Sequence, residues 1–151
     1  MVYRHFLKVS IQARRLHKLA CYRDDARRLR EIPGIGPLTS VQLLIELEDI
    51  NRFINFKHFN GYIGLKPRVH SSGEVDHKGR ITYRSHYALR SALVECAWTA
   101  VQRDPAMLKR YEELRKNHTA KRSIVIIARK LASRIYRVLK TKEPYVTGIV
   151  K

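Results

Sequence analysis

The chain has 151 residues, of which 44% are hydrophobic and 29% are charged, a balance typical of one globular domain rather than of a disordered segment. Lys and Arg outnumber Asp and Glu by 31 to 13, and the formal net charge of +18 favours a polyanionic partner, with nucleic acid as the first candidate. Ribosomal proteins and membrane-surface proteins share this balance, so the charge indicates binding without indicating a chemistry.

The cysteines and the hydropathy exclude several classes of protein. Cys21 and Cys96 are far apart in helical-looking segments, which argues against a disulfide framework and a CxxC metal site, and we expect both to be small buried residues. No run approaches the roughly 18 to 20 apolar residues of a membrane span. Charges interrupt the N-terminus throughout, so no signal peptide is expected. We therefore expect a soluble protein of a reducing compartment, without a membrane partner.

The first segment, from about residue 3 to residue 30, is rich in arginine and has a helical pattern. Leu19, Tyr22, Ala26 and Leu29 follow the 3-4-3 spacing of a coiled-coil seam. The repeat is short, and an amphipathic helix packed on its own domain would show the same spacing, so both interpretations stay open. We assign residues 1–30 to a linker helix.

The second segment predicts two helices joined by a glycine turn, over residues 31–48. The IPGIG motif predicts the turn, and Pro37 suits the first position of the helix that follows. That helix has an apolar stripe formed by Val41, Leu44 and Ile45.

This helix-hairpin-helix pattern predicts contact with a DNA phosphate. The turn would present consecutive backbone N–H groups beside the positive N-terminus of a helix, and such a contact is independent of base sequence. The alternative is that the motif simply turns the chain between two packed helices. The predicted N–H donors belong to Gly34, Ile35 and Gly36, and the flanking basic residues are Arg27, Arg28 and Arg30.

Aromatic residues recur at a spacing of three in the next segment. They predict one buried helical face that ends at Gly64. A hydrophobic core is the favoured role, and a platform for stacking bases is the alternative. The aromatic residues are Phe53, Phe56, Phe59 and Tyr62.

Residues 64–83 are expected to form a loop, and they are rich in glycine, in hydroxyl-bearing residues and in basic residues. Its basic side chains surround Ser71, Ser72 and Gly73, a composition that can hold a phosphate beside a hydroxyl. A Ser-Ser-Gly loop among basic residues is also a common solvated turn, and composition alone favours that interpretation. The basic residues are Lys66, Arg68, His70, Lys78 and Arg80.

Residues 85–140 predict three helices, which makes the expected fold mainly α. The first begins near Ser85, and Pro105 begins the second, which continues to about Lys116. The first helix has an apolar face of Leu89, Leu93, Cys96 and Ala100. The third has an apolar stripe of Ile124, Ile127, Leu131, Ile135 and Val138. Its other faces carry basic side chains, which either lie along a duplex or a guide RNA or are simply solvated. They are Arg122, Arg129, Lys130, Arg134 and Arg137.

Four ordered runs resemble the C-terminal transposase domain of the one-ten (one-sixteen, nine-oh-two) family of insertion sequences. They are IPGIGPLTSVQLL, GLKPRVHSSGEVDHKGRIT, LRSALVECAWTAVQRDP and RSIVIIARKLASRIYRVLK, and the resemblance covers roughly Asp25 to Lys140. Members of this family are also described as bridge-RNA-guided serine recombinases, and the Piv-type invertases are relatives. The resemblance assigns residues 31–151 to the transposase domain.

The resemblance implies a nucleophile and a set of DNA contacts. The family motif Pro-x-x-x-x-Ser-Gly matches Pro67, Ser72 and Gly73, which makes Ser72 the expected nucleophile in DNA strand cleavage, whereas Ser71 is one place out of register. Arg84 lies where many relatives have a lysine and is expected to replace its phosphate contact. The expected side-chain contacts to DNA are Lys66, Arg68, His70, Lys78, Arg80 and Arg84.

The resemblance also implies partners that this chain does not contain. The N-terminal half of the family is a RuvC-like fold whose acidic residues bind a divalent metal, so we expect Mg²⁺ on that half, no metal ligand in this chain and no catalysis by this chain alone. Other expected partners are DNA, guide RNA and further copies of the chain. The expected location is the cytoplasm of a bacterium, in association with the nucleoid. The alternatives are a non-catalytic DNA- or RNA-binding module and an inactive transposase remnant.

Overall fold

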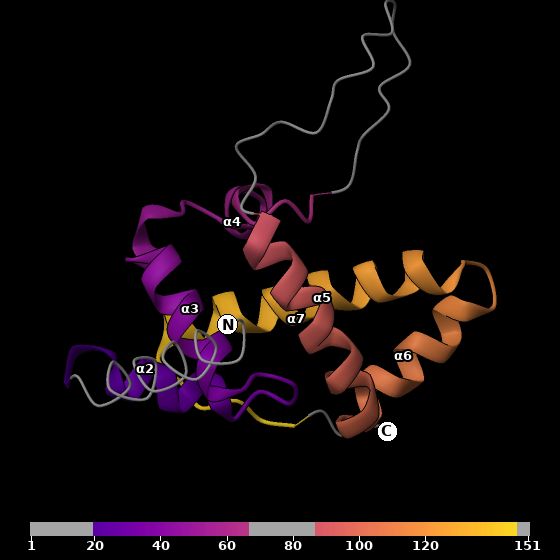
Figure 1. Ribbon diagram of the computed structural model, residues 1–151, viewed down its shortest axis with the longest axis horizontal. Coiled ribbons are helices and arrows are strands. Elements are labelled where there is room, and N and C mark those ends of the chain that lie inside the picture. Colours follow the sequence, from indigo (N-terminus) through magenta and orange to yellow (C-terminus); the bar gives the residue numbers. More distant parts are fainter. Residues whose placement is uncertain (1–19, 67–86, 148–151) are drawn as a thin grey trace, which may run out of the picture.

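The computed structural model describes residues 20–66 and 87–147, and these residues form six α-helices, one 3-10 helix and no strand (Figure 1). The mainly α fold predicted from the sequence is therefore confirmed. In chain order the elements are α2 (Ala20–Arg30), α3 (Pro37–Leu47), η1 (Ile50–Arg52), α4 (Phe56–Tyr62), α5 (Tyr87–Arg103), α6 (Pro105–Arg115) and α7 (Ala120–Thr141).

Helix α7 is the element on which the others are assembled. It runs behind α3 and α5 along the length of the molecule (Figure 1), and it packs against α2, η1, α4, α5 and α6. Its apolar side chains recur every three or four residues and fall on one face, which lies in the core. All five residues of the predicted stripe are buried, namely Ile124, Ile127, Leu131, Ile135 and Val138.

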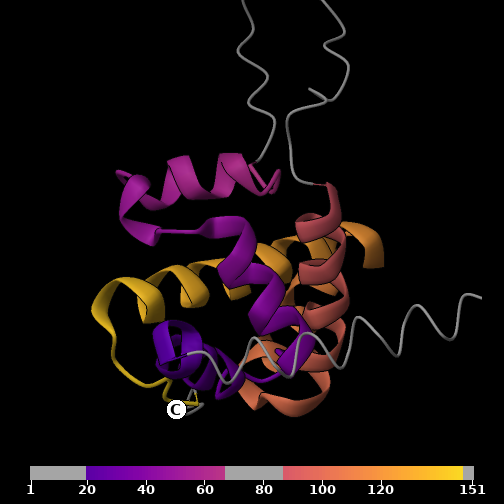
Figure 2. The same ribbon diagram turned by 60° about the vertical axis from the view of Figure 1, so that its left-hand side comes forward.

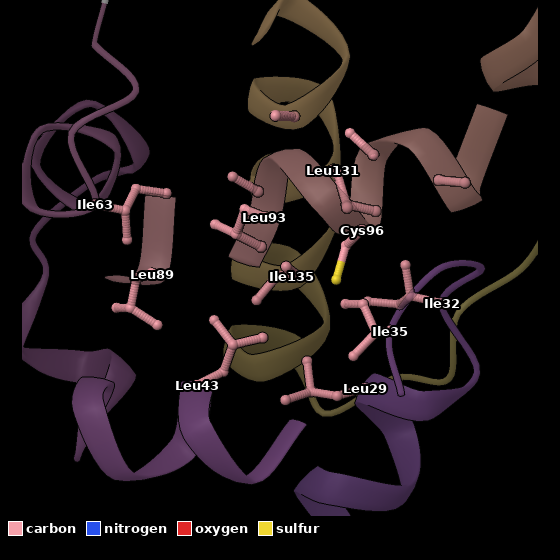
Figure 3. Packing of buried hydrophobic residues seen from close by; sticks show 14 of the residues in the cluster. Leu29, Ile32, Ile35, Leu43, Ile63, Leu89, Leu93, Cys96, Leu131 and Ile135 are labelled. Carbon is pink, nitrogen blue, oxygen red and sulfur yellow. The ribbon is translucent and has the colours of Figure 1, made fainter. Parts of the chain in front are cut away.

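Helices α5 and α6 complete the C-terminal bundle with α7. The predicted apolar face of α5 is confirmed, because Leu89, Leu93, Cys96 and Ala100 are all buried. Figure 3 shows Leu93 and Cys96 among side chains from α3 and α7. Burial raises the pKa of the Cys96 thiol, which fits its expected role as a small buried residue. The side chain of Cys21 lies outside the described residues.

Helix α2 packs within the same core. Ala26 and Leu29 are fully buried, Tyr22 is half-buried against the core, and α2 contacts both α3 and α7. Three of the four residues with the seam spacing therefore face their own domain, as the amphipathic interpretation predicted. The fourth, Leu19, lies outside the described residues.

Helix α3 begins as the sequence predicts, with Pro37 in its first turn and Gly36 as its N-cap. Val41 and Leu44 are buried, but the predicted stripe was wrong for Ile45, which is 47% exposed. The helix packs between α2 and α5, so its buried face is centred on the side that also carries Leu43 and Leu47. Ile45 lies away from that face because each residue of a helix is rotated by about 100° from the one before.

The aromatic residues that follow form a core cluster, as predicted, but they do not lie on one helix. Phe53 lies at the end of η1, and a new helix starts only after Asn55, whose side chain accepts a hydrogen bond of 2.9 Å from the His58 N–H. The rings of Phe53 and Phe59 are 5.3 Å apart, and both side chains are buried. Gly64, with φ of +75°, ends the segment.

A buried carboxylate joins three parts of the C-terminal bundle. Asp104, 1% exposed, caps α6 by accepting a hydrogen bond of 2.9 Å from the Ala106 N–H. It also pairs with Arg134 of α7 at 2.6 Å and accepts a hydrogen bond of 2.9 Å from the Tyr145 hydroxyl. Burial by itself raises the pKa of this carboxyl, but the hydrogen bonds from Arg134 and Tyr145 and the Arg134 charge outweigh it, so the pKa lies below its ordinary value.

This lowered pKa predicts a loss of stability in acid. Because the folded carboxyl binds its proton less readily than the unfolded one, its contribution is fully present above the unfolded pKa of about 3.9 and is lost as the pH falls through the folded value. We expect the wild type to be more stable than Asp104→Asn at neutral pH, and the difference to shrink below about pH 4. Denaturant unfolding of both proteins across this range measures it, and a constant difference would contradict the prediction.

Candidate nucleic-acid interface

Four of the ten predicted site residues lie in the described part of the chain. They are Gly34, Ile35 and Gly36 in the turn between α2 and α3, and Lys66 just after α4. The predicted nucleophile Ser72 lies outside the described residues. So do the remaining predicted DNA contacts, namely Arg68, His70, Lys78, Arg80 and Arg84.

The turn between α2 and α3 is pressed against helix α5. Gly34 has φ of +95°, and a Cβ atom added to it would lie 2.3 Å from the Cys96 carbonyl oxygen. The side chain of Ile35 is 6% exposed, and its N–H already donates to the Ile32 carbonyl oxygen at 3.1 Å. Gly34 and Ile35 therefore take part in the packing of the turn, and the glycine allows the close approach of the two backbones.

The start of α3 is the open side of this turn. Gly36 has φ of −89° and makes no side-chain cap, and a Cβ atom added to it would meet nothing within 4 Å. A helix N-terminus with uncapped N–H groups favours an anion. Of the flanking bases, Arg28 pairs with Asp25 at 3.0 Å, whereas Arg27 and Arg30 are exposed.

A groove lies between the end of α4, the start of α5 and the middle of α7, and we call it the root groove. Figure 2 shows that α4 and the first turn of α5 lie at the same end of the molecule, and residues after α4 and in the first turn of α5 line the groove. Three of its side chains are cationic, Lys66, Arg90 and Arg129, and one, Glu95, is anionic. The remaining lining residues are Gly64, Leu65, Tyr87, Ser91, Val94 and Val125.

The two arginines of the root groove are held by different contacts. Arg129 donates from Nε to the Leu65 carbonyl oxygen at 2.8 Å, which joins α7 to the chain just after α4. Burial lowers the pKa of Arg129, although an arginine keeps its charge in proteins. The Arg90 guanidinium lies 5.4 Å from the centre of the Tyr87 ring, a cation–π contact within the first turn of α5.

A second, shallower groove adjoins the first along α4 and shares Lys66 with it. Its other lining residues include Lys57 and His58, and none of its lining residues is acidic. Five basic side chains line the two grooves, and we call this set the basic strip: Lys57, His58, Lys66, Arg90 and Arg129. Sequence analysis named Lys66 and Arg129 as basic candidates and did not select the other three.

The basic residues of α7 do not act as one surface. Arg134 is paired with Asp104, and Arg129 belongs to the root groove. Arg122, Lys130 and Arg137 are exposed, as predicted for residues on the outer faces of the helix.

The described residues contain neither a metal-binding cluster nor a membrane-spanning helix. Among residues 20–66 and 87–147, no group of three or more His, Cys, Asp or Glu side chains is arranged to hold a metal ion. No helix in these two ranges is long and apolar enough to cross a membrane.

Comparison with known proteins identifies the family. Residues 26–112 match the transposase family IS116/IS110/IS902. The chain is 38% identical over 125 residues to a pilin gene-inverting protein of Moraxella bovis, covering 80% of the chain and 38% of that protein. It is 30% identical over 140 residues to the transposase of insertion sequence element IS1111A of Coxiella burnetii, covering 88% of the chain and 38% of that protein. A similar match is the transposase of element IS1328 of Yersinia enterocolitica, 30% identical over 115 residues, covering 76% of the chain and 34% of that protein.

The chain covers a similar share of the length of each of these relatives. The chain spans 38% of the length of the first two of these relatives and 34% of the third. The family match itself covers more than half of the chain, from the middle of α2 to the middle of α6. The chain therefore belongs to the IS116/IS110/IS902 family of transposases.

Proposed function

We propose that this chain binds DNA in a transposition or inversion reaction and contributes Ser72 as the nucleophile that cleaves a DNA strand. The observation that carries the DNA-binding part is the basic strip, where five basic side chains from α4, α5 and α7 line two adjoining grooves that contain one carboxylate. Family membership and the net charge of +18 support the same substrate. The role of Ser72 follows from its match to the family's Ser-Gly motif.

The proposed step is a displacement at phosphorus. The Ser72 oxygen attacks the phosphorus atom of a DNA phosphodiester, a bond from serine oxygen to phosphorus forms, and the bond from phosphorus to one deoxyribose oxygen breaks. The proton of the serine hydroxyl ends on that leaving oxygen. A deoxyribose hydroxyl of a second strand then attacks the same phosphorus, a phosphodiester forms, and the bond from serine oxygen to phosphorus breaks. The proton of the attacking hydroxyl ends on the serine oxygen, which restores the Ser72 hydroxyl.

The negative charge of the reacting phosphate has to be stabilised during this step, and the described residues supply only part of that stabilisation. Cations of the basic strip can bind neighbouring phosphates, but the described residues have no cluster of acidic or imidazole groups that fits a divalent metal. Following the family resemblance, we propose that Mg²⁺ binds to a RuvC-like N-terminal half and that this chain acts together with that half as a partner. Because recombination joins two DNA ends, a homo-oligomer is part of the proposal, and guide RNA is a further proposed partner.

A denaturing-gel assay for covalent protein–DNA adducts tests the proposal. Labelled element-junction DNA is mixed with Mg²⁺, guide RNA and the chain, with and without a family N-terminal half in trans. We expect an adduct with the wild type when the added half is present, and none with Ser72→Ala. Ser71→Ala is the matched control and should retain the adduct.

The other outcomes are equally distinct. An adduct that survives Ser72→Ala and disappears with Ser71→Ala would move the nucleophile by one residue. Salt-sensitive DNA binding by all proteins without any adduct would leave a DNA-binding module and contradict the role of Ser72. Absence of binding would overturn both parts of the proposal.

A further inference from the structure

We infer that Lys66, Arg90 and Arg129 form a binding site for a backbone phosphate of DNA in the root groove. The inference rests on the proposed DNA-binding function and goes beyond it by naming the side chains that hold the phosphate. Lys66 follows α4, Arg90 lies on α5 and Arg129 lies on α7, and the fold brings these distant parts of the chain together so that all three residues line one groove. Five guanidinium N–H donors per arginine and three ammonium donors suit the oxygens of a phosphodiester.

Among the described residues, the charges that line the root groove are unbalanced. Within residues 20–66 and 87–147, none of Lys66, Arg90 and Arg129 forms an ion pair. Like charges gathered in one groove repel each other, and the single carboxylate that lines it, Glu95, does not balance three of them. A bound anion would supply the missing charge. Elsewhere in the described chain, five cations have a carboxylate within 4 Å: Arg28, Arg52, Arg110, Arg134 and Lys142.

Arg129 is oriented by a contact with the backbone. Its Nε donates to the Leu65 carbonyl oxygen at 2.8 Å, and this bond does not use the donors of the two terminal nitrogens. A side chain held in this way loses little conformational entropy when it binds a phosphate. Its half-buried position also strengthens the attraction to an anion, because the local dielectric constant is lower than that of water.

The two grooves that share Lys66 favour a polymeric anion over a small free anion. The root groove continues into the groove on α4 through Lys66, where Lys57 and His58 lie on an open surface. Lysine and arginine side chains distributed over two adjoining grooves suit a strand that presents more than one phosphate. A single phosphate ion would use the root groove alone.

The salt dependence of DNA affinity tests this inference. Anisotropy of a labelled duplex is measured between about 50 and 200 mM salt with the wild type, Lys66→Gln, Arg90→Gln and Arg129→Gln. Each variant should bind about tenfold more weakly at the lower salt concentration, and the slope of log affinity against log salt should fall by about 0.9 for each phosphate that the variant no longer binds. The matched controls, Arg103→Gln and Lys109→Gln, remove the same charge from exposed positions outside the groove and should keep the wild-type slope.

The outcomes separate this inference from the proposal on which it rests. If the wild type fails to bind DNA, the proposed function fails. If it binds with a steep salt dependence but the groove variants match the controls, only the phosphate site is overturned. Arg129→Gln also removes the bond to Leu65, so its thermal unfolding is recorded, and Lys66→Gln and Arg90→Gln, which break no such bond, remain decisive. The same measurement is repeated with an RNA duplex. If the groove variants lose affinity for RNA but keep the wild-type affinity for DNA, the DNA phosphate site is also overturned.

Discussion

Gly34→Ala is expected to lower the free energy of unfolding by about 2–6 kcal/mol. The residue has φ of +95°, and its added Cβ would lie 2.3 Å from the Cys96 carbonyl oxygen and 3.0 Å from the Ala100 nitrogen. Both of those atoms belong to the backbone of α5, so relief requires the turn to move away from the helix and to open the core beside Ile35. Urea unfolding followed by circular dichroism measures the change.

The matched control is Gly61→Ala. Gly61 lies within α4, and a Cβ atom added there would meet nothing within 4 Å. Alanine favours a helix over glycine, so this variant should be more stable than the wild type by about 0.5–1 kcal/mol. Equal stability of the wild type and Gly34→Ala would show that the turn does not lie close to α5.

Asp104→Ala is expected to lower the free energy of unfolding by about 3–5 kcal/mol at neutral pH. The substitution leaves the Arg134 guanidinium without its carboxylate in a half-buried position, and it removes both the cap of α6 and the acceptor of the Tyr145 hydroxyl. The loss is large because Arg134 keeps its charge while losing its partner. Thermal unfolding and urea unfolding both report it.

Glu113→Ala is the control for Asp104→Ala, because it also removes a carboxylate that is paired with an arginine. The pair between Glu113 and Arg110 spans 3.0 Å, but both side chains are nearly half exposed, at 45% and 47%. An exposed pair of this kind contributes about 0–1 kcal/mol. Equal destabilisation by the two variants would contradict the structural role assigned to Asp104.

The long helices could be predicted from the sequence because each carries several independent signals. Helix α7 has five apolar residues at helical spacing, and Pro105 and Pro37 lie in the first turns of α6 and α3. The short elements could not be predicted in this way. The side chain of Asp49 caps η1, which ends at Phe53, and the side chain of Asn55 caps α4. The regular spacing of the aromatic residues therefore continues across two separate elements.

The basic site was harder to predict for a different reason. From the sequence, Lys66 was grouped with the basic residues around Ser72 and Arg129 with those of the last helix, and Arg90 was not selected. The three residues line one groove only because α5 and α7 pack together. The glycine turn shows a related ambiguity. Close approach to a ligand and close approach to another helix both require a residue without a side chain at Gly34, and only the position of α5 distinguishes them.

The position of α7 in the chain affects the order of folding during synthesis. It follows the other described helices in the sequence, yet α2, η1, α4, α5 and α6 all pack against it. Until α7 has left the ribosome, those helices lack the one helix against which all of them pack. Since these contacts join distant parts of the chain, we expect this domain to fold in one late step, and nascent chains that stop before residue 120 to remain substrates for proteases and chaperones.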